Sequence, residues 1–82
     1  MMRVEILGTG CPKCKATEQV VRQALAGLGI QAEVLHVTDP LEIRRRRVMF
    51  TPAVVIDGEL VSAGHVPTEE QARGFVQRKL AR

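Results

Sequence analysis

The two cysteines of this chain, Cys11 and Cys14, are the residues best suited to chemistry, and they lie three positions apart. They bracket Pro12 and Lys13 in a Cys-x-x-Cys motif, which follows an apolar run and a Gly-Thr-Gly turn at residues 8–10. Two thiols at this spacing can form a disulfide, share a metal ion or exchange electrons with another protein. Because a disulfide between them closes only a very short loop, it would stabilise the fold little, and the pair indicates chemistry.

The position of the motif favours a reactive thiolate. The segment from Pro12 onward has helical periodicity, so Cys11 lies where a helix begins, close to unpaired N–H groups and the positive end of the helix dipole. Both favour the anion, and Lys13 adds positive charge nearby. Cys14 lies about one helical turn further on and is expected to be more buried and less acidic. We therefore expect Cys11 to attack a substrate disulfide and Cys14 to resolve the mixed disulfide.

Length and charge limit the other possibilities. A chain of 82 residues predicts a single domain, 1–82, with a modest core. The formal net charge is +3, and much of the excess lies in four successive arginines, Arg44 to Arg47. Such a run can contact nucleic acid or an acidic partner, or it can be a solvated helix end. Nucleic acid is not the expected partner, because Phe50 and Phe75 are the only aromatic rings on which bases could stack.

The cellular setting follows from cysteine use and hydropathy. No basic stretch with a long apolar run and a cleavage site occurs, so a signal peptide is not expected. No apolar run reaches about 18 residues, so no membrane association is expected. The default expectation is therefore the reducing cytoplasm, where a lone Cys-x-x-Cys is more often redox-active or metal-binding than structural, and a monomer is the expected state.

The elements that must position the motif are predicted in the order β-α-β-α-β-β-α. Residues 3–7 and 32–37 are expected strands, joined by an amphipathic helix over 12–26, and this unit implies parallel pairing. Thr38 or Asp39 is expected to cap a short helix in which Leu41, together with Ile43 or Val48, can face the core.

The second half of the chain predicts a hairpin and a final helix. Residues 53–56 and 59–61 are expected to pair around the Asp57-Gly58 turn. Thr68 and Gln71 have the spacing of a capping box, which would open the last helix.

This order, with Cys-x-x-Cys after the first strand and Thr51-Pro52 before the hairpin, resembles the thioredoxin fold over nearly the whole chain. Within that superfamily it looks like the small thioredoxin-like, or glutaredoxin-like, redox-active disulfide proteins. The resemblance implies an α/β fold with a four-stranded mixed sheet flanked by three helices. It also implies a thiol–disulfide oxidoreductase that needs no cofactor beyond the Cys11–Cys14 disulfide.

The resemblance assigns roles to residues beside the thiols. The Thr51-Pro52 bond is expected to be cis and to face the dithiol turn, with the backbone of Thr51 available to pair with an extended substrate. Pro12 would restrict the backbone between the thiols. The expected partners are disulfides in proteins or small molecules, together with a reductase or glutathione as reductant.

A metal-binding module is the rival interpretation. Copper-chaperone-like domains also place Cys-x-x-Cys between a first strand and a first helix, and soft thiolates suit Cu(I), with Zn²⁺ also conceivable. Those domains favour a methionine two residues before the first cysteine, where this chain has Thr9. They also run β-α-β-β-α-β and end on a strand, whereas a final helix is predicted here.

Four further residues carry open expectations. Glu5 lies six residues before Cys11, where thioredoxins have an acid that relays a proton to the second cysteine. The preferred alternative is an edge or face acid in contact with water. His36 is expected to be structural, and His65 either an ordinary loop residue or a group that tunes Cys11 or binds a metal. Arg47 occupies a position where related proteins often have glycine, so a left-handed conformation there would cost some strain.

Overall fold

The computed structural model describes residues 2–9 and 12–80, and it has the predicted order of elements. The observed bounds lie within two residues of the predicted ones. The elements are β1 (Met2–Leu7), α1 (Pro12–Leu28), β2 (Ala32–Val37), α2 (Pro40–Arg45), β3 (Ala53–Ile56), β4 (Glu59–Ala63) and α3 (Glu69–Leu80).

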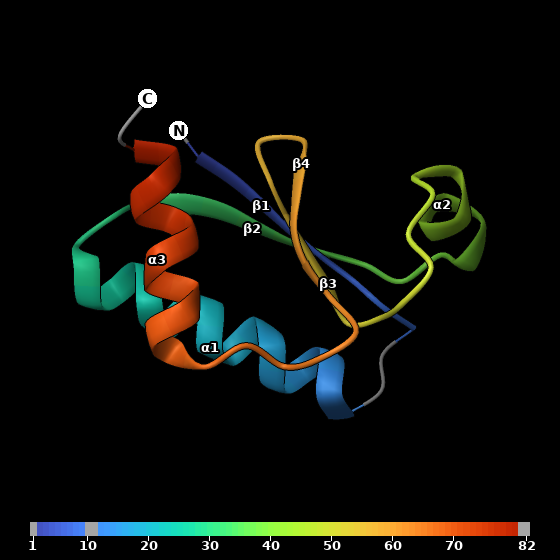
Figure 1. Cartoon of the computed structure of the whole chain (residues 1–82), viewed down its shortest axis with the longest axis horizontal. Coiled ribbons are helices and arrows are strands. Elements are labelled where there is room, and N and C mark those ends of the chain that lie inside the picture. Colours follow the sequence, from blue (N-terminus) through green and yellow to red (C-terminus); the bar gives the residue numbers. More distant parts are fainter. Residues whose placement is uncertain (1, 10–11, 81–82) are drawn as a thin grey trace.

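The four strands form one mixed sheet in the order β2-β1-β3-β4 (Figure 1). β1 pairs in parallel with β2, with Val4 opposite Val34, as a right-handed strand–helix–strand unit requires. β3 is antiparallel to both β1 and β4. The parallel pair brings the carboxyl ends of β1 and β2 to the same end of the sheet, and α1 and α2 follow directly from them.

Short-range signals start the helices and close the hairpin as predicted. Asp39 caps α2, because its side chain accepts a hydrogen bond from the Leu41 N–H at 3.0 Å. Thr68 and Gln71 form the capping box of α3, each backbone N–H donating to the other's side chain at 3.0 and 3.1 Å. In the hairpin turn, Asp57 has a φ of 50° and the following glycine one of 86°, a combination typical of tight β-hairpins.

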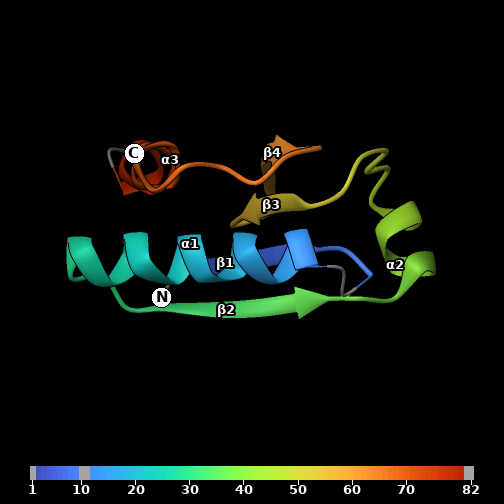
Figure 2. The same cartoon turned by 90° about the horizontal axis from the view of Figure 1, so that it is seen from below.

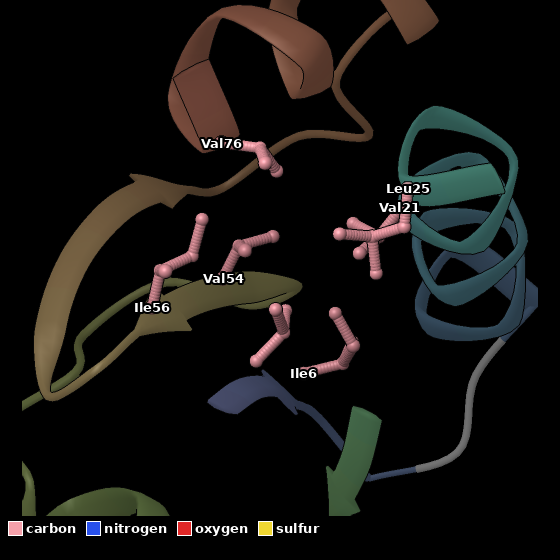
Figure 3. Packing of buried hydrophobic residues seen from close by; sticks show 7 residues of the cluster. Ile6, Val21, Leu25, Val54, Ile56 and Val76 are labelled. Atoms are coloured by element: carbon pink, nitrogen blue, oxygen red, sulfur yellow. The ribbon is translucent and has the colours of Figure 1, made fainter. Parts of the chain in front are cut away.

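The main core lies between the sheet and the pair α1 and α3. Figure 3 shows the side chains of both helices and of β1 and β3 pointing toward one another. Burial of one such aliphatic side chain contributes about 1.5–3 kcal/mol, so this layer holds α1 against β1. Its buried members are Val4, Ile6, Val21, Leu25, Val54, Ile56 and Val76.

A smaller cluster lies on the opposite face of the sheet, where α2 packs. Its buried members are Leu7, Ile43, Ala53 and Val55. Alternation along β1 explains the division, because successive side chains of a strand point to opposite faces. Figure 2 shows α2 at one end of the sheet and α3 near the other.

Two expectations for the α2 region have different outcomes. Of the residues expected to face the core, Ile43 is buried and Val48 half-buried, but Leu41 is 69 % exposed, so the prediction was wrong for Leu41. Six helical residues bury only one narrow stripe, and Leu41 lies outside it. Arg47 does adopt the left-handed conformation, with a φ of 58°, which confirms the expected strain at this position.

In the part of the chain that the structure describes, no helix has both the length and the apolar character needed to cross a bilayer.

Candidate functional site

Cys14 lies in the first turn of α1 and is fully buried beneath the end of β1. The predicted attacking thiol, Cys11, and its neighbour Gly10 lie outside the described residues. The predicted burial of Cys14 is confirmed, and the comparison with Cys11 stays a prediction. Pro12 is the first residue of α1, as predicted, and both Pro12 and Lys13 are exposed.

The Cys14 sulfur packs directly against Gly8. A Cβ atom placed on Gly8 would fall well inside the van der Waals contact distance of Cys14 Sγ and 3.2 Å from Cys14 Cβ. The same position lies 3.9 Å from Thr51 Cβ. Gly8 is held at this point because its N–H donates to the Val37 carbonyl at 2.9 Å, which extends the pairing of β1 with β2. The structure thus brings Gly8, Cys14 and Thr51 together.

The Thr51-Pro52 peptide bond is cis, as predicted. Pro52 is fully buried, whereas Thr51 before it is exposed. The Pro52 carbonyl accepts a hydrogen bond from the Gly64 N–H at 3.0 Å. Gly64 has a φ of 88°, which a glycine adopts without strain, so the loop after β4 lies against this proline.

The start of α1 is electrostatically suited to an anion. Its first turn holds no acidic residue, and Lys13 and Lys15 are both exposed there. The first N–H groups of a helix have no partner within the helix, and they carry the positive end of its dipole. The positive field at the N-terminus of α1, which residue 11 directly precedes in the sequence, is therefore not offset by any carboxylate of the first turn.

The preferred expectation for Glu5, an edge or face acid in contact with water, was wrong. Glu5 is 6 % exposed on the central strand β1, so it is not an edge or face acid in contact with water. Its carboxylate accepts a hydrogen bond from the Arg46 guanidinium at 2.7 Å. That bond is the main reason why the pKa of Glu5 is lowered, and it outweighs the opposing effect of burial. A relay acid needs a raised pKa, so Glu5 is poorly suited to take a proton from Cys14.

Glu5 points to the other face of β1 from the residues that pack against α1. Val4 and Ile6 point toward α1, which carries Cys14, whereas Glu5 points to the opposite face and meets Arg46 after α2. Arg46 also donates to Glu42 at 3.2 Å. This network fastens the end of α2 to the central strand. The expectation of a fully solvated arginine run is therefore wrong for Arg46.

The two histidines take no part in the described site. His36 Nδ1 lies 3.4 Å from Glu18 Oε1 between β2 and α1, which agrees with its expected structural role. His65 is exposed in the loop after β4, next to Gly64. Within residues 2–9 and 12–80, no three His, Cys, Asp or Glu side chains converge in a way that could hold a metal ion.

Sequence reasoning missed Gly8 and Gly64 as parts of the site. The Gly-Thr-Gly turn at residues 8–10 was the only sign of Gly8, and it indicated a turn and not a contact with sulfur. Gly64 stood in a predicted loop with nothing to connect it to Pro52. Both contacts join segments that meet only after the sheet has formed.

The contact at Gly8 predicts a costly substitution. In Gly8→Ala the new methyl group must displace the Cys14 sulfur or the end of β1. Since overpacking a filled core costs about 1–3 kcal/mol, we expect the free energy of unfolding to fall by about that amount. Urea denaturation of the reduced protein measures the change.

Gly74→Ala in α3 is the matched control. A Cβ at Gly74 meets no atom within 4 Å. Alanine is favoured over glycine inside a helix by about 1 kcal/mol, so this variant should be as stable as the wild type or more so. Equal stability of Gly8→Ala and the wild type would contradict the Gly8 contact.

A family profile and two relatives agree on one family. The profile of the family described as Thioredoxin domain matches residues 2–77. A protein named Thioredoxin from Methanocaldococcus jannaschii is 42% identical over 73 residues, which cover 89% of this chain and 84% of that protein. Another Thioredoxin, from Methanothermobacter thermautotrophicus, is 34% identical over 73 residues, covering 89% and 95%.

Solved structures match in fold. Chloroplastic thioredoxin z superimposes with a TM-score of 0.76 at 14% identity, covering all of this chain and 80% of that one. Thioredoxin-2, described as a component of malaria parasite protein secretion machinery, gives a TM-score of 0.71 at 12% identity, covering 95% and 82%. At such low identity these two likenesses bear on the fold alone.

Proposed function

Because the chain belongs to the thioredoxin domain family, we propose that it is a thiol–disulfide oxidoreductase that works through Cys11 and Cys14. The observation that carries the proposal is the position of Cys14. Its sulfur lies against Gly8 at the end of β1, beside Thr51 and the cis proline Pro52. Cys14 is a buried thiol about one helical turn after Cys11, which is the position expected of a thiol that attacks a mixed disulfide formed by Cys11.

The proposed reaction has two exchange steps. The Cys11 thiolate attacks one sulfur of the substrate disulfide, forms a mixed disulfide and releases the other substrate sulfur as a thiolate. Cys14, as its thiolate, then attacks the Cys11 sulfur, so that the Cys11–Cys14 disulfide forms and the second substrate thiolate leaves. The substrate disulfide gains two electrons and, on protonation, two protons, while the protein dithiol is oxidised.

The helix start supports Cys11 as the attacking group. The orphan N–H groups of α1 and the absence of acid in its first turn favour a thiolate at the preceding residue. Lys13 adds an exposed cation, and Pro12 restricts the backbone between the sulfurs. On this proposal no cofactor is needed beyond the dithiol. The substrates are disulfides in proteins or small molecules, and glutathione or a separate reductase returns the dithiol to its reduced form.

The rival, a Cu(I) or Zn²⁺ module built on the same thiols, has less support. Its β-α-β-β-α-β order ends on a strand, whereas the sheet here is followed by α3 (Glu69–Leu80). Thr9 stands where those domains favour methionine. Both differences support the redox proposal.

A redox titration tests the proposal. The purified protein is equilibrated with mixtures of reduced and oxidised glutathione, and the Cys11–Cys14 disulfide is quantified after acid quenching by mass spectrometry. We expect one two-electron transition, in which the ratio of disulfide to dithiol changes tenfold for about 30 mV. Failure to form this disulfide, or tight stoichiometric Cu(I) or Zn²⁺ in the purified protein, would favour the rival.

A further inference from the structure

We propose that the last residues of α2 and the segment after it form a docking surface for an acidic protein partner, whose disulfide lies beside an apolar residue and next to Asp or Glu. The surface, called here the α2 rim, consists of Arg44, Arg45, Arg47, Met49 and Phe50. The inference deepens the proposed function and rests on it, because the partner is the protein whose disulfide is exchanged.

The arginines of the α2 rim form few ion pairs with the residues that the structure describes. Of the four successive arginines, only Arg46 is drawn into the structure, by its bonds to Glu5 and Glu42. Arg45 is 79 % exposed and approaches Glu42 at 3.6 Å, a surface pair of small energetic value. Arg44 and Arg47 are exposed and form no ion pair with any residue that the structure describes. Three guanidinium groups therefore remain available to carboxylates of a partner.

Arg47 lies just beyond the end of α2 and keeps its side chain on the surface. With a φ of 58°, it adopts the left-handed conformation that commonly ends a helix. Its N–H donates to the Arg44 carbonyl at 2.9 Å, and the Val48 N–H donates to the Ile43 carbonyl at 3.4 Å, so the backbone here is accounted for by the helix end. The exposed guanidinium of Arg47 therefore adds to the charge of Arg44 and Arg45 without a structural partner among the described residues.

The α2 rim also exposes its apolar residues. Met49 is 86 % exposed and Phe50 is 67 % exposed, although large apolar side chains usually become buried where the chain allows. Phe50 borders the site, since a Cβ placed on Gly64 would lie 3.3 Å from Phe50 Cβ. Exposed apolar residues beside polar ones are typical of protein interaction surfaces.

The α2 rim lies at the end of the molecule that holds the site. α2 follows β2 at the end of the sheet where β1 also finishes (Figures 1 and 2). Phe50 is followed directly by Thr51. Thr51 and the Cys14 sulfur both lie next to Gly8. A partner whose apolar residue contacts Met49 and Phe50 thus has its neighbouring disulfide close to the dithiol, with its carboxylates near the arginines.

The test compares two disulfide-bridged peptides with the same apolar core, one flanked by aspartates and one by lysines. The neutral compound 2-hydroxyethyl disulfide is the third substrate, and excess dithiothreitol keeps the protein dithiol reduced. The test variant is R44Q/R45Q/R47Q. The control variant R3Q/R22Q/R78Q removes the same three charges from β1, α1 and α3.

Because electrostatic steering raises association rates by about tenfold or more, the wild type should show a kcat/KM about tenfold higher for the acidic peptide at low salt. High salt should remove this preference. The α2 rim variant should lose it while still reducing 2-hydroxyethyl disulfide, and the control variant should keep it. Phe50→Ser should raise KM for both peptides with kcat unchanged.

Three results would overturn the inference. Equal kcat/KM values for the two peptides would exclude an acidic partner, and equal losses in the two triple variants would reduce the effect to net charge. If the protein bound single-stranded RNA through the three arginines and showed no preference between the peptides, the α2 rim would be a nucleic-acid surface. In each case continued reduction of 2-hydroxyethyl disulfide leaves the proposed function standing, whereas no reduction of any disulfide would overturn the function itself.

Discussion

The Cys14→Ser variant should accumulate as a mixed disulfide between Cys11 and its substrate, and its turnover should fall by at least about a hundredfold. A neighbouring group held in place acts at an effective molarity that can reach about 10⁵ M, far above any external thiol, so resolution without Cys14 is slow. Cys11→Ser should instead lose the attack step and form no adduct. Non-reducing electrophoresis and intact mass measure the adduct, and reduction of 2-hydroxyethyl disulfide measures turnover.

The burial of Cys14 calls for a folding control. A serine hydroxyl at this fully buried position introduces a polar group, so the variant can lose stability for a reason unrelated to exchange. Cys14→Ala removes the thiol without adding a polar group and should trap the same adduct. Circular dichroism checks that both variants are folded. Turnover equal to the wild type in both the Cys11 and Cys14 variants would refute the proposed exchange.

The second large effect is expected at the ion pair between Glu5 and Arg46. Arg46→Gln leaves the Glu5 side chain, which is 8 % exposed, without its guanidinium partner. Removing one partner of a fully buried pair costs about 3–5 kcal/mol, and because the Arg46 side chain is 31 % exposed we expect about 2 kcal/mol here. Urea denaturation at neutral pH measures the loss in free energy of unfolding.

Arg45→Gln is the matched control, one residue earlier in the same run. The Arg45 side chain is 79 % exposed and only approaches Glu42, so its removal should change stability by less than about 0.5 kcal/mol. If Arg45→Gln and Arg46→Gln were equally destabilising, the ion pair with Glu5 would not be the cause.

The pH dependence gives a separate signature of the same pair. The pKa of Glu5 is lowered in the folded protein, so the unfolded chain binds its proton first as the pH falls. The contribution of the pair is fully present above the unfolded pKa, near 4.3, and is lost as the pH falls through the folded pKa. The stability difference between wild type and Arg46→Gln should therefore be largest at neutral pH and shrink in acid. A difference independent of pH would contradict this origin.

Local patterns in the sequence were enough to predict the elements and the position of the dithiol. Asp39 as helix cap, the Thr68 and Gln71 capping box and the turn at Asp57 depend on residues two or three positions apart. The cis bond before Pro52 was implied by the resemblance to a known fold and was also confirmed. Such features are predictable because the groups that interact are neighbours in the chain.

What the sequence by itself determined is therefore the order of elements and a Cys-x-x-Cys motif at a helix start. Only the tertiary structure decided that Glu5 is paired with Arg46, forty-one residues later. It also decided that the Cys14 sulfur packs against Gly8 and that Gly64 lies against Pro52. Strand alternation by itself does not show which element covers the face of the sheet on which Glu5 lies. That depends on where α2 packs, and no local pattern contains that information.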